Sequence, residues 1–190
     1  MKTRFCGASV LYLIIGIFGL FSIIGSAING TGTITGAVLN TLACLYFAIV
    51  LFIKKRGIPT FIALAIFTVV GAINRNIFDI IAYALLFVLA LSACDKRIIK
   101  TNFFKKINFI PGILIVLSFI YSAVITMVNV APNIGFARYI GVMAPSYVMN
   151  ILDIIAVFVV GKWLAYPYKK GVAEAAASAA AVETEAEVQE

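Results

Sequence analysis

Apolar residues fill most of the chain in long runs, and polar residues interrupt these runs at only a few places. The apolar segments lie at residues 8–28, 34–53, 58–73, 77–93, 109–130 and 145–165. A helix crosses the hydrocarbon core of a bilayer with ~17–25 predominantly apolar residues. The pattern therefore predicts an all-α, polytopic integral membrane protein, with six transmembrane helices arranged as three helical hairpins.

The connections between the segments indicate where the helices begin and end. Only Asn74-Arg75-Asn76 separates the third segment from the fourth, which predicts a tight hairpin. The six spans make up a membrane domain at residues 1–170. Residues 171–190 are rich in Ala and Glu and have no apolar periodicity, so we expect an acidic, disordered or partly helical cytoplasmic tail.

The composition excludes several classes of protein. The chain is 63% hydrophobic and 12% charged, whereas soluble domains are roughly 45–50% apolar and about 25% charged. Histidine is absent and the three cysteines have no metal-binding spacing, so neither a His-ligated metal site nor a Ser-His-Asp triad is expected. No metal, cofactor or nucleic-acid partner is predicted, and the expected surroundings are the lipid bilayer.

The basic residues indicate an orientation for the six spans. Thirteen of the 15 Lys and Arg residues fall on one side of the predicted membrane, and Arg75 and Arg138 fall on the other. Basic loops stay in the cytoplasm. We therefore expect a multi-pass protein of the cell (plasma) membrane with both termini cytoplasmic. Aromatic residues at the span ends, Trp163 inside and Tyr139 outside among them, are interpreted as interfacial anchors.

The first apolar segment has a second interpretation. Lys2 and Arg4, an apolar stretch and Gly25-Ser26-Ala27 together also fit a cleaved signal peptide. The stretch is about 20 residues long, and a signal-peptide core has ~7–15, so the length favours a membrane span. Cleavage would leave the orientation of the other five spans unchanged.

A seven-residue motif occurs twice inside the apolar segments. Asn76–Ala82 (NIFDIIA) matches Asn150–Ala156 (NILDIIA) with a single Phe/Leu exchange. Residues three apart lie on one helix face, so the Asn and the Asp of each copy can address one partner. Both copies are expected in the outer half of the membrane, on helices that run in the same direction.

These copies supply the candidate functional residues. An ionisable side chain in hydrocarbon is costly and usually faces the bundle interior. We expect Asp79, Asp153, Asn76 and Asn150 to form a polar site. A stripe of Ser, Thr and Asn at helical spacing in the fifth span can line the same interior, and it ends at Asn129.

A purely structural interpretation of the same residues stays open. Arg75 lies four residues before Asp79 and can form an ion pair with it, and Arg138 can do the same for Asp153. Asn and Asp near a helix start also serve as caps. The polar stripe can equally hold helices together.

The candidate site favours a small transport protein or channel for a proton, a cation or a small polar solute. Asp79 and Asp153 would bind the ion or solute, the three Asn residues would be neutral ligands, and Arg75 would lie beside them. The small chain suggests a homo-oligomer or a larger membrane-complex partner.

Two other functions compete with transport. The alternative is a non-catalytic accessory or scaffold subunit of a larger membrane complex. In size and six-span layout the chain resembles the substrate-capturing subunits of vitamin importers, which dock on an ATP-driven module; the resemblance is one of architecture, without a shared motif. A lipid-acting membrane enzyme is the least favoured, because such an enzyme usually has more carboxylates, or a His, near the surface, and no enzymatic activity is predicted.

Overall fold

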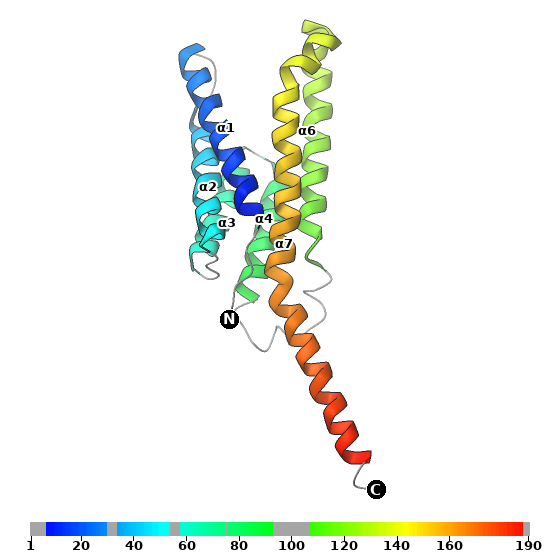
Figure 1. Cartoon of the computed structure of the whole chain (residues 1–190). Coiled ribbons are helices and arrows are strands. Elements are labelled where there is room, and N and C mark those ends of the chain that lie inside the picture. Colours follow the sequence, from blue (N-terminus) through cyan, green and yellow to red (C-terminus); the bar gives the residue numbers. More distant parts are fainter. Residues whose placement is uncertain (1–6, 30–33, 54–57, 75, 93–106, 188–190) are drawn as a thin grey trace.

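The described part of the chain is entirely helical. The computed structural model describes residues 7–29, 34–53, 58–74, 76–92 and 107–187 (Figure 1). Within these ranges there are no strands, and the helices are α1 (Ala8–Asn29), α2 (Ile34–Phe52), α3 (Ile58–Ile73), α4 (Ile77–Ser92), α6 (Ile110–Ile134) and α7 (Phe136–Glu187). The predicted all-α class is confirmed, and each predicted apolar segment is helical over most of its length.

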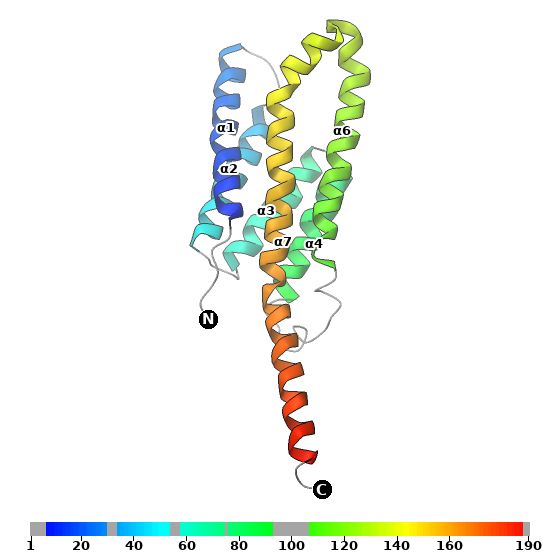
Figure 2. The ribbon, with the colours of Figure 1, turned by 45° about the vertical axis from the view of Figure 1, so that its right-hand side comes forward.

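Helices that are consecutive in the sequence pack against each other in pairs. α1 packs on α2, α3 on α4 and α6 on α7, while α4 also packs on α6 and α1 on α7. Figures 1 and 2 show the α1–α2 pair on one side of the molecule and the α6–α7 pair on the other. The shorter α3 and α4 lie between and below the two pairs. Helices that follow one another in the sequence are thus also neighbours in space.

Glycines allow the paired helices to approach closely. A Cβ atom on Gly16 would lie 2.6 Å from Cδ2 of Leu45, and one on Gly19 would collide with Oγ1 of Thr41. Small residues serve this purpose at helix crossings in membranes. Gly16 and Gly19 are therefore used for packing inside this chain, against α2.

An aromatic cluster joins the first four helices. Tyr12, Phe47, Phe67 and Tyr83 contribute one ring each from α1, α2, α3 and α4. The ring centroids of Tyr12 and Phe47 are 5.0 Å apart, and Phe67 stacks on Tyr83 at 4.7 Å. All four side chains are buried. Offset and edge-to-face ring pairs of this kind contribute about 0.5–1.5 kcal/mol beyond their buried area, so the cluster fixes the mutual position of these helices.

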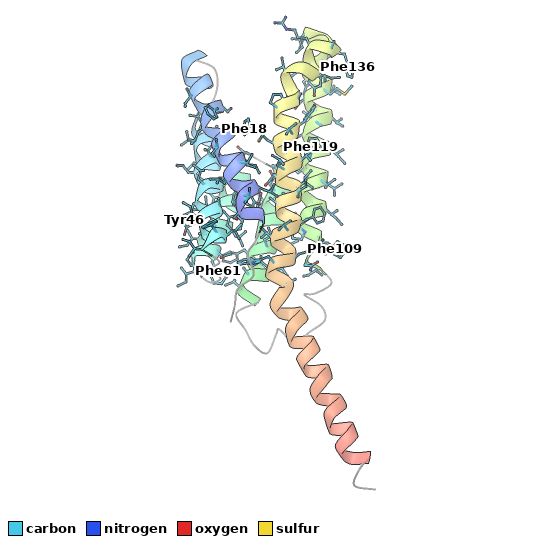
Figure 3. The ribbon with its side chains drawn as sticks, viewed as in Figure 1. Phe18, Tyr46, Phe61, Phe109, Phe119 and Phe136 are labelled. Atoms are coloured by element: carbon cyan, nitrogen blue, oxygen red, sulfur yellow. The ribbon has the colours of Figure 1, made fainter. Side chains whose placement is uncertain are left out.

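Large apolar side chains also cover the outside of the bundle. Each of the six helices exposes such residues, and Figure 3 shows large side chains projecting outward, with Phe109 and Phe136 labelled. Two helical stretches among the described residues are long and apolar enough to cross a membrane, Ile110–Ile134 and Phe136–Ala165. Shorter apolar helices lie at Ala8–Ile24, Ala37–Phe52, Ile58–Ile73 and Ile77–Leu91.

Two predicted interfacial anchors are buried instead. Trp163 is 6% exposed and belongs to the hydrophobic core, and Tyr139 is 2% exposed. The hydroxyls of Tyr139 and Tyr147 are hydrogen-bonded to each other, and Tyr139 also donates to the Ala123 carbonyl at 3.5 Å. The interpretation of Trp163 and Tyr139 as anchors was wrong, because each ring gains more by packing between helices than by facing an interface.

α7 is much longer than the sixth predicted span. Gly135 alone separates α6 from α7, so the connection expected at residues 131–144 is helical except at this glycine. The helix also continues to Glu187 through most of the segment predicted as a disordered tail. Ala and Glu have high helix propensities, and extending an existing helix needs no new nucleus, which explains the helical tail.

We expect Gly135→Ala to destabilise the protein and Gly141→Ala to leave it as stable or more so. Gly135 has a φ of 79° and a ψ of 146°, a region that L side chains rarely adopt, whereas Gly141 lies inside α7. A Cβ would meet no atom within 4 Å at either site, so the two substitutions differ in backbone strain alone. The expected cost at Gly135 is ~1–3 kcal/mol, and Gly141→Ala should gain up to ~1 kcal/mol of helix propensity.

The free energies of unfolding can be compared by SDS titration of both variants in mixed micelles with dodecyl maltoside. Equal stability of the two variants would show that the turn at Gly135 does not need its glycine.

Candidate functional site

The two repeated aspartates line one cavity. Asp79 lies in the first turn of α4 and Asp153 lies within α7. A cavity of about 290 Å³, the smaller cavity, lies between them and the inward face of α6. Its lining residues are Asn74, Asn76, Asp79, Ile115, Ser118, Phe119, Ser122, Asn150 and Asp153. Four of the six predicted site residues therefore come together here.

A larger cavity adjoins the same aspartate on the side of α1 and α2. It has a volume of about 500 Å³. Its lining residues are Ile15, Phe18, Gly19, Ser22, Ala37, Asn40, Thr41, Cys44, Phe67, Tyr83, Val142, Pro145, Ser146, Met149, Asn150 and Asp153. Asn150 and Asp153 appear in both linings, so these two residues separate the smaller cavity from the larger cavity.

The carboxylate of Asp153 is held by tyrosines of the aromatic cluster. The Tyr83 hydroxyl donates towards both carboxylate oxygens at 3.3 Å, and Tyr12 lies close to the same carboxylate. A distance of 3.3 Å is long for an O–H···O bond. An ionised carboxylate has about four acceptor sites, so these contacts orient Asp153 without using its full capacity to bind a proton donor or a cation.

Asn76 has a structural role as well as a place in the smaller cavity. Its Oδ1 accepts a hydrogen bond from the Phe78 N–H at 3.2 Å, which makes Asn76 the N-cap of α4. Its Nδ2 donates to Oγ of Ser118 on α6 at 2.6 Å, and Ser118 is also hydrogen-bonded to Asp79. The start of α4 is therefore tied to α6 through one serine.

The two copies of the repeat are not structurally equivalent. The first copy begins α4, where Asp79 also benefits from the positive end of the helix dipole. The second copy lies inside α7, fourteen residues after its start at Phe136, and the Asn150 side chain donates to the Ser146 carbonyl at 2.8 Å. The capping interpretation is therefore right for Asn76 and does not apply to Asn150.

The remaining predicted residues lie elsewhere. Asn129 is exposed and is absent from the described linings of both cavities; its carbonyl accepts a bond from Asn133 Nδ2 at 2.8 Å. Arg75 falls outside the described residues. Arg138 is exposed, and within the described ranges it forms no ion pair with Asp153.

Three residues of the site were missed by the sequence analysis. Tyr83 lies one helical turn after Asp79, so its spacing could have signalled a shared face. Tyr12 and Thr41 gave no signal, because they approach Asp153 and its cavity only through the packing of α1 and α2 beside α7.

Neither described lining contains a basic residue. Two carboxylates thus face polar cavities in an otherwise apolar bundle, without Lys or Arg among the described lining residues. A carboxylate withdrawn from water must be hydrogen-bonded, protonated or paired with a cation. Carboxylate, amide and hydroxyl oxygens are suited to a proton or a hard cation. The described residues contain no group of three or more Cys, Asp or Glu side chains that could hold a metal ion.

Comparison with models of protein families, with curated proteins and with solved structures finds no match for this chain.

We expect Ser118→Ala to weaken the contact between α4 and α6. The change removes the acceptor of the 2.6 Å bond from Asn76 and the hydrogen bond to Asp79. The free energy of unfolding should fall by about 0.5–1.5 kcal/mol. Ser122→Ala is the matched control, because Ser122 lines the same cavity one turn later but is exposed.

SDS titration of both variants provides the measurement. A loss of stability as large in Ser122→Ala as in Ser118→Ala would rule out a special role for the Asn76–Ser118 bond.

Proposed function

We propose that the chain forms a six-span membrane domain with both termini in the cytoplasm. The apolar side chains exposed on all six helices support this, because soluble proteins rarely expose large contiguous apolar surfaces. α1 and α2 have 22 and 19 residues, enough for a span. α3 and α4 have 16 residues each, about 24 Å of helix, and a short span is accommodated by local thinning of the bilayer.

The orientation rests on the distribution of charge. With six crossings, thirteen of the 15 basic residues, those before α1, after α2, after α4 and from Lys162 onward in α7, lie on one side, and Arg75 and Arg138 lie on the other. Such an excess marks the cytoplasmic side. Asp79 and Asp153 then lie towards the outer side of the bundle, because α4 and α7 both run inward from the outer surface.

Within this domain we propose a small transport protein or channel that moves a proton or a cation through the site at Asp79 and Asp153. The observation that carries the proposal is that both carboxylates line the smaller cavity with no described basic residue beside them. Ionisable residues inside a membrane domain characteristically mark ion and proton pathways. The adjoining larger cavity extends the polar route past Asp153.

The six-span layout predicts which positions an impermeant reagent can reach. Single cysteines at Asn74 and Asn133 should react with a membrane-impermeant maleimide in intact cells, in a variant that lacks Cys6, Cys44 and Cys94. Cysteines at Gly57 and Lys100 should react only after permeabilisation, because the proposed layout places them in the cytoplasm. Labelling of Gly57→Cys from outside would contradict the proposed orientation.

Flux through reconstituted liposomes tests the proposed activity. Proton flux is followed with a pH-sensitive dye trapped inside, and cation flux with radiolabelled Na⁺ or Rb⁺. Asp79→Asn and Asp153→Asn should each reduce the flux to the rate of protein-free liposomes, because an amide cannot neutralise a cation or carry a proton.

Two further variants act as controls for that experiment. Asp95→Asn makes the same chemical change at the third acidic residue of the membrane domain and should leave the flux unchanged. Arg75→Gln tests whether Asp79 binds the transported ion or only pairs with Arg75. If Asp79 only formed a structural ion pair with Arg75, Arg75→Gln would reproduce the loss of flux expected for Asp79→Asn. Wild-type flux in both aspartate variants would contradict the proposed transport function.

A further inference from the structure

The larger cavity has the size of an organic ligand site. Its volume of about 500 Å³ lies within the ~300–1,000 Å³ range of small-molecule pockets. One water occupies about 30 Å³ of liquid, so a lone metal ion would leave most of this space to be filled by solvent. The cavity therefore suits a molecule with its own body, whereas the smaller cavity has room for an ion and a few waters.

The polar residues of the larger cavity define where a charged group would bind. Asp153 is the only charged side chain among its described lining residues. Asn40 from α2 and Asn150 from α7 add amide oxygens, and Thr41 adds a hydroxyl. Because the Tyr83 bonds are long and leave acceptor sites on the carboxylate, Asp153 can accept hydrogen bonds from a cationic donor in the cavity.

Apart from the hydroxyls of Ser22, Ser146 and Tyr83, the other lining residues are apolar or aromatic. Phe18 and Ile15 from α1, Phe67 from α3 and Met149 from α7 supply carbon and sulfur surface beside the carboxylate. Aromatic faces attract ammonium ions through the ring quadrupole, and Met adapts to varied apolar shapes. An apolar lining with one anionic anchor excludes phosphates and carboxylates, because they would face Asp153 without a neutralising group.

We propose that the larger cavity binds a small organic ammonium ion with an apolar body. The ammonium group pairs with Asp153 and the body packs against Phe18, Phe67 and Met149. This inference rests on the proposed transport function and names its solute. Since Asp153 also lines the smaller cavity, a proton or cation there competes with the ammonium group for one carboxylate. Binding of one ligand then releases the other, so binding in the two cavities is coupled.

Binding of three related probes to the purified full-length protein tests the proposal. 2-Phenylethylamine carries a positive charge, 2-phenylethanol is neutral and 3-phenylpropanoate is negative, and all three have the same aromatic body. Isothermal titration in dodecyl maltoside micelles should show the amine binding about tenfold or more tightly than either analogue. The neutral alcohol also controls for partitioning into micelles.

Variants locate the binding site. Asp153→Asn should weaken amine binding by about tenfold or more, whereas Lys162→Gln, which removes one charge of the opposite sign at an exposed position of α7, should leave it unchanged. Ala37→Phe places a ring into the larger cavity and should also abolish binding while leaving the carboxylate intact. That variant keeps the test decisive if Asp153→Asn fails to fold.

The outcomes separate this inference from the proposed transport. Equal binding of the three probes, or amine binding that survives Ala37→Phe, overturns the ammonium site. Aspartate-dependent ion flux without amine binding overturns it too and leaves the proposed function standing. Amine binding in a protein that carries no flux supports the site and removes the transport proposal.

Discussion

The constraint on which this structure depends is the cost of placing the Asp153 carboxylate inside an apolar helical bundle. The carboxylate cannot be left without partners, and in the described structure the Tyr83 hydroxyl donates to it while Tyr12 lies close by. Tyr83 and Tyr12 are themselves held by ring contacts that reach α2 and α3. One buried acid on α7 is thereby connected to each of the first four helices, so the site and the core of the bundle share the same side chains.

The repeated heptapeptide shows how one local sequence serves two structural purposes. At α4 the helix begins with the motif, and Asn76 satisfies a backbone N–H that would otherwise have no partner. In α7 the motif lies in the helix interior, where the backbone is already satisfied and Asn150 is free to line both cavities. The two acids reach one cavity from different helical contexts, which gives them different surroundings.

The packing divides the chain's abundant apolar surface into two parts. Glycines and rings at the helix crossings make a narrow core, and the remaining Leu, Ile, Val and Phe side chains stay on the outside. Such a core is too thin to bury every polar position; the larger cavity lies where α1, α2 and α7 meet, and the smaller cavity lies where α4, α6 and α7 meet. In this arrangement Asp153 lines two cavities at once, which is the geometrical basis of the proposed exchange between two ligands.

The sequence by itself determined the helical class, the position of the apolar helices and the presence of two acids that come together with Asn76 and Asn150. These features depend on hydrophobic runs, caps and spacings within one or two helical turns, and such interactions are local. Only the tertiary structure decided that Asn129 lies outside the cavities, that Trp163 and Tyr139 are buried and that Tyr12 reaches Asp153. It also decided that α7 runs unbroken from Phe136 to Glu187. Which of these side chains are buried or line a cavity depends on how each helix is rotated about its axis against neighbours distant in the sequence. The length of α7 follows from the low cost of extending a helix that already exists.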